Sequence, residues 1–576
     1  MSCARRRRRG PRFNLRPRAH GGQSTLGARR SRTLLCRVPT PSRLLSRWCS
    51  FGSILRAVIA LAASLGASSL GFSSAEAQDR SRPRVRAVLV QRDAVFDSAE
   101  ARYWPYRLAN ALHAETRPNV IRRELLIDVG DPYDSALVAE SERNLRALGI
   151  FRDVRIDSVA TDSGIVVLVR TADAWTTTMG VGVATSGTQS VIDLSLQEGN
   201  LLGTRTVALL AYRNDPDRSS IALAFDTPRA IGDRIGVGVS GVDRSDGRAG
   251  SASLRLPFLS LSSRAGASLT GSVFQGRVLQ FRGSAIVDSL WRELAVLRAD
   301  GAVALTAGPR GYVRVGMLAQ LLRDDMVPME DRSAVPKTRS ATAGPYLAVR
   351  RPRYIRVWNV ERIARVEDVD LGPFATAALL AAPSAWGYER NGIGGSLGAG
   401  VGLRFPGGFA RFGVRASTLQ TAEGTDSATV EGATTVVAQR GERHLVVLHG
   451  SAGRQRNAVP GREFDLGLGA GLRAFPAHAF TGDRYFVLAG EYRYLVWPRL
   501  FGLLGVGAAA FGGHAGAWDG GGPQRTGTEL GAGLRLASIR EAGGIWRLDL
   551  SRRLAGDGFT GGWVASLGRG FVFGGI

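Results

Sequence analysis

The sequence predicts a mostly β protein, with a C-terminal transmembrane antiparallel β-barrel preceded by a small α/β domain of βααββ order. The 576-residue chain contains 74 glycines and only 7% aromatic residues, which favours many short strands and turns over several enzyme-like cores. Clear helical periodicity is confined to residues 84–172. Residues 176–576 carry short alternating segments between Gly, Asp, Asn and Pro turns, as transmembrane barrels do.

Residues 1–77 are predicted to be an Arg-rich leader that ends in a cleaved signal peptide. The apolar run 57–72 follows Arg56 and precedes Ala75-Glu76-Ala77, which is the order of a secretory signal and its cleavage site. This run is too short, and too rich in Ala, Ser and Gly, for a helix that needs about 20 apolar residues to cross a membrane. We expect export, with cleavage before Gln78.

The positive charge of the chain is concentrated in this leader. Its fifteen arginines and Glu76 contribute +14 of the formal +26, which leaves +12 for the rest and weakens a nucleic-acid-binding interpretation. The Arg-rich stretch before the apolar run is consistent with a misassigned start codon or with an RNA-binding arm, and we favour the former. Cys3, Cys36 and Cys49 all lie in the leader, so the mature chain is expected to hold no disulfide and no cysteine-based metal site.

The small domain, residues 84–172, has a readable order of elements. We predict a strand over 85–96, a helix over 119–127 capped by Thr116, a helix from 135 capped by Asp134 or Ser135 and ended by Gly149, and a hairpin of strands around 154–156 and 165–169. Gly130 is expected to end the first helix.

Three segments of this domain carry a family resemblance. VIRRELLIDVGDPYD, ERNLRALGIFRDVRI and IVVLVRTAD resemble the polypeptide-transport-associated (POTRA) domain of the BamA-like outer-membrane assembly and two-partner secretion superfamily, also called the bacterial surface antigen family. The resemblance implies a periplasmic domain. Its open sheet edges would allow a client segment to add as a strand through backbone hydrogen bonds.

The barrel prediction for residues 176–576 is clearest in two segments. In Tyr485–Trp497, residues Phe486, Leu488, Tyr492, Tyr494 and Val496 fall on one face, whereas Glu491 and Arg493 fall on the other. In IWRLDL, Trp546, Leu548 and Leu550 alternate with Arg547 and Asp549. An Arg facing lipid costs about 2–4 kcal/mol at the midplane, so these charges are expected to face a polar lumen.

A soluble sandwich also alternates, but it does not need aromatic residues such as Tyr494, Trp497 and Trp546 near strand ends. About 400 residues at about 25 per strand and connection predict about 16 strands.

Two further motifs resemble the same superfamily. EGNLLGTR, residues 198–205, is similar to its first-hairpin motif. LRAFPAHAFTGDRYFVLAGEYRY resembles its lumen-loop motif, which implies a structural latch formed by Arg473, Phe475 and Glu491, with Gly482 and Asp483 as the turn. The sequence departs from the motif at Ala474, where glycine is usual. The strand LFGLLGVGAAAFGG lacks the inward Asp of many members, which leaves the second partner of the latch open.

The C-terminus resembles the closing strand of such barrels. Trp563, Leu567, Phe571 and Phe573 occupy alternate positions of a terminal aromatic strand, which assembly machineries are expected to recognise. Gly574-Gly575-Ile576 follows the last Phe, whereas the common pattern ends on the aromatic residue.

No catalytic residue, cofactor or metal site is expected. Gly394–Gly398 fits G-x-S-x-G and Gly236–Gly241 fits G-x-G-x-x-G, but neither is followed by the helix that its chemistry requires. The six histidines are scattered without ligand spacing.

The resemblance implies a protein of the bacterial outer membrane, with the POTRA-like domain in the periplasm, that inserts or translocates polypeptides. The expected partners are the lipid bilayer, unfolded outer-membrane or secreted polypeptides, and other subunits of an assembly complex, without nucleic acid. Two alternatives stay open: a transporter dedicated to one secreted partner, and a passive pore or structural surface barrel.

Overall fold

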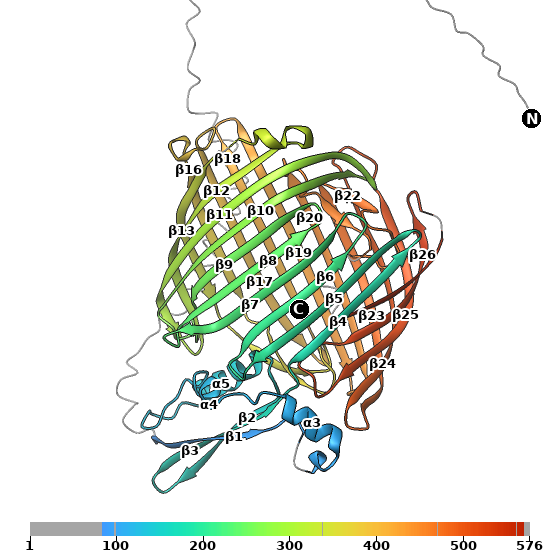
Figure 1. The fold of residues 1–576 in the computed structure, drawn as a ribbon. Helices are drawn as coiled ribbons and strands as arrows, with labels where there is room; N and C mark the ends of the chain where they lie inside the picture. The colour runs from blue at the N-terminus through green and yellow to red at the C-terminus, as the bar shows by residue number, and fades with distance from the viewer. Residues whose placement is uncertain (1–82, 97–98, 337, 469–470, 560, 570–576) are drawn as a thin grey trace, which may run out of the picture. The chain divides into compact units, whose positions relative to one another are not determined.

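A computed structural model describes residues 83–96, 99–336, 338–468, 471–559 and 561–569 (Figure 1). The predicted leader and signal peptide, residues 1–77, lie outside these ranges, as do Phe571 and Phe573. None of the helices in the described ranges is long and apolar enough to cross a membrane.

The N-terminal domain, residues 83–174, has the predicted β, helix, helix, β, β order with one additional helix. Its three-stranded sheet has the order β1-β3-β2, in which β3 is parallel to β1 and antiparallel to β2. The elements are β1 (Val85–Asp93), η2 (Glu100–Arg102), α3 (Trp104–Leu112), α4 (Pro118–Arg122), α5 (Ser135–Ala147), β2 (Phe151–Thr161) and β3 (Gly164–Asp173). The sequence prediction missed α3.

The ends of α4 and α5 show which local signals decided the helices. Asp134 caps α5 by accepting a hydrogen bond from the backbone N–H of Ala136 at 2.7 Å, and Gly149 adopts a left-handed φ of 72° just after it, as predicted. The prediction for α4 was wrong at both ends. Its N-cap is Arg117 in place of Thr116. It ends at Arg122 instead of residue 127, because the chain leaves the helix and Leu126 donates its N–H to Ser141 Oγ of α5 at 2.9 Å.

Apolar residues between the sheet and helices α4 and α5 form the core of this domain. The buried members are Val85, Val120, Ile121, Ile127, Val138, Leu145, Ile150, Phe151, Val154, Val167 and Val169.

The C-terminal part is a closed barrel of 20 strands, so the prediction of about 16 was too low. The estimate assumed about 25 residues per strand and connection, whereas most connections are hairpin turns of a few residues. The first ten strands are β4 (Thr177–Ser186), β5 (Gln189–Leu201), β6 (Thr206–Asn214), β7 (Ser219–Ile231), β8 (Ile235–Arg244), β9 (Gly247–Leu256), β10 (Ala265–Arg282), β11 (Ala285–Gly308), β12 (Gly311–Pro328) and β13 (Ser340–Arg350).

The remaining ten strands complete the closed antiparallel order and return to β4. They are β16 (Phe374–Ala382), β17 (Gly392–Phe405), β18 (Gly408–Thr421), β19 (Gly424–Arg440), β20 (His444–Arg456), β23 (Arg484–Leu500), β24 (Leu504–Trp518), β25 (Thr526–Ser538), β26 (Trp546–Gly556) and β27 (Trp563–Arg569). Both glycine motifs lie inside strands, β8 and β17, which fits their interpretation as barrel backbone.

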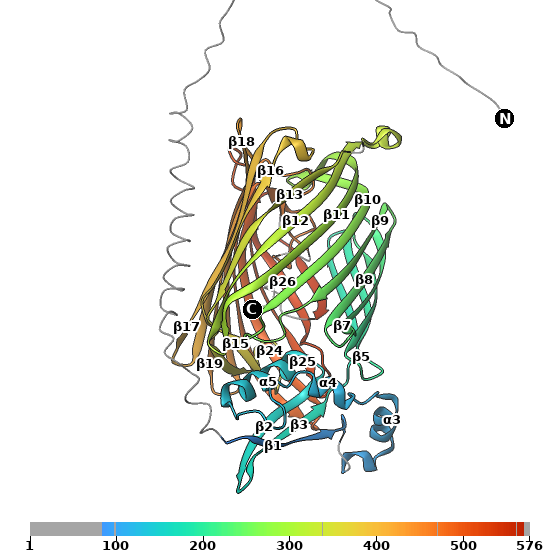
Figure 2. The same ribbon diagram turned by 90° about the vertical axis from the view of Figure 1, so that its left-hand side faces the viewer.

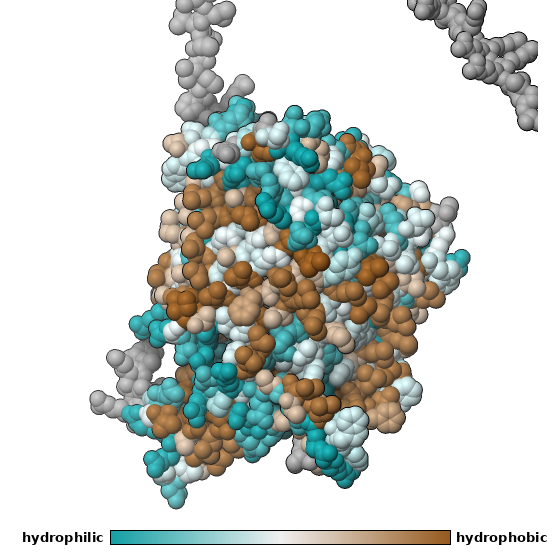
Figure 3. Space-filling model, viewed as in Figure 1, coloured by the Kyte–Doolittle hydropathy of each residue, from teal (hydrophilic) through white to brown (hydrophobic). Residues whose placement is uncertain are grey.

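The two faces of the barrel wall follow the alternation in the sequence. Leu488 and Tyr492 are exposed on the outside of β23, whereas Glu491 between them is 1% exposed. Leu548 and Leu550 are likewise exposed on β26, and Asp549 between them is buried. Figure 3 shows hydrophobic residues gathered over the middle of the barrel wall. The outside of these segments is therefore apolar, and the charged side chains of Glu491 and Asp549 point inward.

Two connections between barrel strands are much longer than the others. The first joins β13 to β16 and contains the hairpin β14 (Tyr354–Trp358) and β15 (Val366–Asp370). Two 3-10 helices, η3 (Met329–Ala334) and η4 (Ser384–Trp386), lie in the turns at the opposite ends of β13 and β16. The second long connection joins β20 to β23 and contains the short strands β21 (Phe464–Leu466) and β22 (Phe480–Gly482). We call these connections the β14–β15 hairpin (residues 351–373) and the lumen loop (residues 457–483).

Candidate functional site

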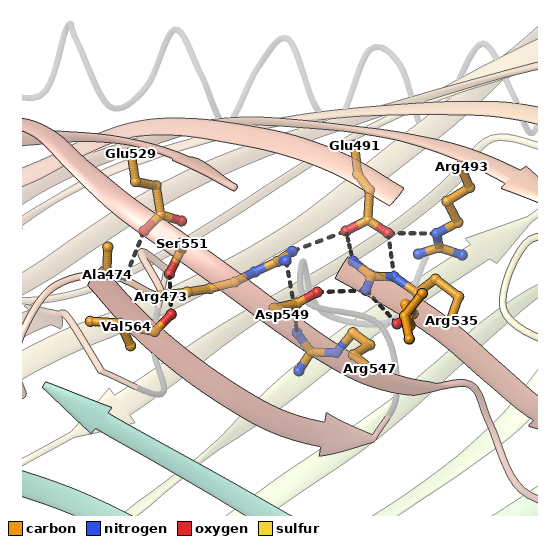
Figure 4. Close-up of polar contacts among 11 residues, drawn as sticks. Arg473, Ala474, Glu491, Arg493, Glu529, Arg535, Arg547, Asp549, Ser551 and Val564 are labelled. Carbon is orange, nitrogen blue, oxygen red and sulfur yellow. Dashed lines mark hydrogen bonds and ion pairs between the residues drawn. The ribbon is translucent and has the colours of Figure 1, made fainter. Parts of the chain in front are cut away.

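The lumen loop meets the barrel wall at a buried cluster of charged residues, which we call the lumen network (Figure 4). Its members come from the loop and from three neighbouring strands: Arg473, Glu491, Arg493, Arg535, Arg547 and Asp549. The side chains of Glu491 and Asp549 are 0% exposed. Buried carboxylates are tolerated only when they are paired and hydrogen-bonded, and each of these two faces three guanidinium groups.

Glu491 of β23 binds the predicted partner, Arg473. Arg473 Nη2 donates to Glu491 Oε2 at 3.0 Å, so the structure brings the two residues together as the motif resemblance implied. Arg535 Nη2 donates to the same oxygen at 2.8 Å, and Arg493 Nε donates to Oε1 at 2.6 Å. Figure 4 shows both oxygens of this carboxylate occupied by guanidinium groups.

The second partner of Arg473, which the sequence left open, is Asp549 of β26. Arg473 Nη1 donates to Asp549 Oδ2 at 2.8 Å, and Arg535 Nη1 donates to Oδ1 at 2.6 Å. The sequence prediction placed Asp549 in the lumen but did not connect it with the loop. Glu491 and Asp549 are 58 residues apart in the sequence, and strands β24 and β25 lie between their strands in the wall.

The residues next to Arg473 fit the same wall. Phe475 is 0% exposed and lies against Phe480 and Phe559, with ring centroids 5.1 and 5.8 Å away. Any side chain at Gly527 or Gly556 would collide with the Phe475 ring, so these two glycines make room for it. The N–H of Ala474 donates to Glu529 of β25 at 2.6 Å. The loop is thus held by an arginine, an aromatic ring and a backbone hydrogen bond.

The predicted turn residues have other surroundings. Gly482 lies in β22 and not in a turn, and it passes so close to the backbone of Trp518 that a Cβ would not fit. Asp483 Oδ1 accepts the N–H of Gly520 at 2.8 Å. Of the predicted C-terminal signal residues, Trp563 is exposed on β27, and Phe571 and Phe573 lie outside the described residues.

A histidine that the prediction did not single out fastens the outer part of the lumen loop. His478 lies between Asp465 of β21 and Asp217 of the β6–β7 turn, at 2.6 and 3.1 Å, and stacks on Phe281. Burial alone lowers the pKa of a histidine, but the hydrogen bonds and charges of Asp217 and Asp465 outweigh it and raise the pKa of His478 to about 9. The imidazole is therefore charged at neutral pH and bridges two carboxylates.

The β14–β15 hairpin reaches the lumen network from the other end of the lumen. Arg493 Nη1 donates to the carbonyl of Val360 in the turn of the hairpin at 2.8 Å. Ile363 in the same turn is buried against Leu495 of β23 and Ala537 of β25. Glu491 is thus one hydrogen-bonded step from the lumen loop and two steps from the hairpin.

The hairpin also packs along the inner wall. Its buried core contains Val357, Val360, Val369 and Leu371 together with Phe409 of β18, Val437 of β19, and Leu445 and Val447 of β20. The hairpin therefore packs stably inside the lumen, which the sequence analysis did not predict.

The N-terminal domain is attached to the same end of the barrel. In the EGNLLGTR motif, Asn200 is 1% exposed and donates from Nδ2 to Thr116 Oγ1 at 2.9 Å, while the Gly203 carbonyl accepts the N–H of Arg117 at 3.0 Å. Arg146 of α5 forms a two-pronged ion pair with Asp368 of the hairpin, at 2.6 and 3.0 Å. The first-hairpin motif therefore serves as the joint between domain and barrel.

The closing junction of the barrel is its shortest within the described residues. Two residue pairs join β27 to β4, Ser566 with Ala184 and Leu567 with Val183, whereas seven join β26 to β27. Arg569 Nη1 adds a hydrogen bond to the carbonyl of Met179 across this junction at 2.6 Å. Behind the junction lies a cavity of about 370 Å³ between the lumen loop and the wall.

Within the described part of the chain, no group of three or more His, Cys, Asp or Glu residues is placed to hold a metal ion.

Comparison with known protein families gives a match in the N-terminal domain. The POTRA family model, described as a surface antigen variable number repeat, matches residues 113–171. The comparison with curated proteins gave no match.

Solved structures similar to this chain include CdiB from two organisms and a BamA. CdiB from Escherichia coli has a TM-score of 0.42 and 11% identity, covering 93% of this chain and 100% of that chain. CdiB from Acinetobacter baumannii has a TM-score of 0.43 and 10% identity, covering 85% and 74%. BamA from Haemophilus ducreyi lacking POTRA domains 1–3 has a TM-score of 0.35 and 12% identity, covering 84% and 85%.

The matched residues span α4, α5, β2 and β3 and confirm the POTRA part of the expected resemblance. The chain therefore contains a POTRA domain and joins it to a closed antiparallel β-barrel, the two parts that the sequence predicted.

Proposed function

We propose that this protein inserts or translocates polypeptides at the bacterial outer membrane, with its POTRA domain on the periplasmic side. The observation that carries the proposal is the attachment of a POTRA domain to the barrel end at which β4 begins and β27 ends. A client held by the domain is thereby delivered next to the shortest junction of the wall.

Client capture needs a sheet edge, and the POTRA domain has two. Strands β1 and β2 flank β3 in the three-stranded sheet. An extended client segment can pair with such an edge through backbone hydrogen bonds, with little demand on its sequence. Because unfolded outer-membrane and secreted polypeptides differ widely in sequence, this mode of binding suits them.

Release into the membrane needs a place where wall hydrogen bonds can be exchanged. Opening the barrel between β27 and β4 breaks the two described residue pairs and the Arg569 contact, fewer than at any other junction described here. Inside a bilayer the exposed amides must find new partners, and a client strand supplies them. The reaction is an exchange of hydrogen bonds and requires no nucleotide.

A second candidate, translocation of one dedicated partner through the lumen, is favoured by the lumen filling. The lumen loop and the β14–β15 hairpin occupy opposite ends of the lumen and are connected through Glu491 and Arg493. Both would have to move for a chain to pass, as in a gated transporter. A passive pore does not require two lumen segments that are joined by a buried ion network.

Depletion of the protein in its native host, followed by mass spectrometry of the outer membrane, separates these functions. Broad loss of many barrel proteins supports general insertion. Loss of one secreted protein supports dedicated translocation. An unchanged outer membrane and secretome would contradict both and leave the passive barrel.

A further inference from the structure

The additional helix α3 (Trp104–Leu112) presents an apolar face that the POTRA domain does not cover. Trp104, Leu108 and Leu112 are spaced by four residues, so they share one face of the helix. They are 68%, 50% and 71% exposed, and Tyr103 just before them is 52% exposed. The four side chains form the outer face of α3. Such exposure of large apolar residues in a cluster marks an interaction surface.

Contacts of the opposite face of α3 keep the outer face exposed. Tyr106 stacks on Phe96 with the ring centroids 4.5 Å apart. The side chain of Asn110 bonds twice to the backbone of Phe96, accepting its N–H at 3.1 Å and donating to its carbonyl at 2.8 Å. These three contacts hold the helix in one rotation about its axis, so the outer face cannot turn inward without breaking them.

Both ends of α3 are tied to the rim of the barrel beside the closing junction. Before the helix, Glu100 pairs with Arg540 of the β25–β26 turn. Just after it, Arg117 Nε donates to the carbonyl of Leu202 in the β5–β6 turn at 3.1 Å. These turns lie on the two sides of the β27–β4 junction. In Figure 2, α3 lies at the side of the POTRA domain nearest the end of β5.

The barrel rim beside the helix is apolar on its outer side. Met179 on β4 and Leu202 in the β5–β6 turn are each 67% exposed. The segments before and after α3 are tied to this rim through Arg540 and Leu202. The helix contains no acidic residue in its first turn, and Arg102 and Arg107 beside it are exposed, which suits contact with phosphate headgroups.

We propose that α3 is an interfacial helix that lies in the periplasmic leaflet of the membrane next to the closing junction. Trp and Tyr at the start of its outer face match the headgroup region, where amphipathic aromatic rings are favoured. Leu108 and Leu112 reach the acyl boundary. The occupant is lipid because the helix is tied at both ends to a rim whose outer side is apolar, whereas a captured client needs a free strand edge. The helix thereby fixes the POTRA domain at the junction.

The test uses fluorescent labels on single cysteines in the full chain, in which Cys3, Cys36 and Cys49 are replaced by serine. The protein is reconstituted in phosphatidylethanolamine–phosphatidylglycerol vesicles that contain nitroxide-labelled lipid. Leu108→Cys reports on α3. Leu89→Cys is the matched control, because Leu89 is similarly exposed, at 53%, on strand β1 of the POTRA sheet. Leu223→Cys, 61% exposed on the outside of β7, reports on the barrel wall.

We expect the label at position 108 to be quenched by shallow nitroxide lipid at least about threefold more than the label at position 89. Adding Leu112→Glu should remove most of this difference and leave position 223 unchanged. Equal accessibility of positions 108 and 89 to aqueous iodide would overturn the inference. Protection of position 108 only after an unfolded polypeptide is added would also overturn it, in favour of a client site. The inference rests on the proposed membrane location, and absence of quenching at position 223 would contradict that location itself.

Discussion

Replacing Glu491 with glutamine tests whether the lumen network holds the lumen loop in place. Glutamine keeps the size of the side chain and one acceptor oxygen but removes the negative charge. Arg473 and Arg535 then keep Asp549 as a buried carboxylate partner within the network, whereas Arg493 loses the ion pair that it forms with Glu491. The loop arginine and the hairpin-contacting Arg493 both lose their common partner, so both lumen segments should loosen together.

The expected size of the effect follows from the burial of this site. The side chains of Glu491, Arg473 and Arg535 are 0%, 8% and 1% exposed. Removing one partner of a buried ion pair costs about 3–5 kcal/mol, because the remaining charge stays desolvated. At 1.4 kcal/mol for each factor of ten, the equilibrium between docked and released loop shifts by about two to three and a half powers of ten.

Single-channel recording in planar bilayers measures this shift as open probability, and the temperature of heat modification on gels measures barrel stability. Glu529→Gln is the matched control. Glu529 is also a buried carboxylate of the same wall, but the bond it accepts from the loop is the Ala474 N–H, which an amide oxygen accepts equally well. Unchanged openings and unchanged stability in Glu491→Gln, with a control that behaves like the wild type, would refute the latch. Equal effects of both variants would assign the change to general damage of the wall.

Three further predictions concern the other contacts of the lumen and the junction. Arg569→Gln removes the hydrogen bond to Met179 and the ion pair with Glu541, so the heat-modification temperature should fall. The control Arg552→Gln on β26 should leave this temperature unchanged. Equal temperatures for Arg569→Gln and the wild type would show that the junction does not depend on Arg569. The lumen loop should be released from its outer anchor at high pH, because a group whose folded pKa is raised to about 9 contributes stability that is complete below about 6.5 and is lost as the pH rises through 9. Channel openings should therefore increase between pH 7 and pH 10, and His478→Gln should abolish that dependence; an unaltered pH profile in this variant contradicts the assignment. Ile363→Ala should destabilise the docked tip of the β14–β15 hairpin by about 2–5 kcal/mol, because Ile363 is only 2% exposed, and should raise the open probability. Ile393→Ala, at a site that is 47% exposed, should leave the open probability unchanged.

The sequence was sufficient where a local signal and the final environment agree. Asp134 and Gly149 mark the ends of α5 because a cap and a left-handed glycine act within one turn of the helix. The alternation around Glu491 placed its carboxylate on the inner face, since strands alternate with a period of two. The sequence analysis missed helix α3 because its large apolar residues face outward, so the helix lacks the buried apolar stripe by which the other helices were predicted.

Family resemblance contributed what neither propensity nor periodicity contains. It connected Arg473 with Glu491 across a loop, and it recognised the POTRA domain that the family model then matched. It did not identify Asp549 as the second partner or the hairpin contact at Val360. Those two contacts belong to parts of the wall and of the β13–β16 connection that the motif does not include.

The sequence by itself determined the two-part architecture and the inward face of charged strand residues such as Glu491 and Asp549. The tertiary structure alone decided the number of strands, the second carboxylate of the lumen network and the meeting of lumen loop and hairpin at Glu491 and Arg493. The physical reason is closure. Strand number and inter-strand neighbours are fixed by the curvature at which the whole wall satisfies its edge hydrogen bonds, and no short stretch of sequence carries that condition.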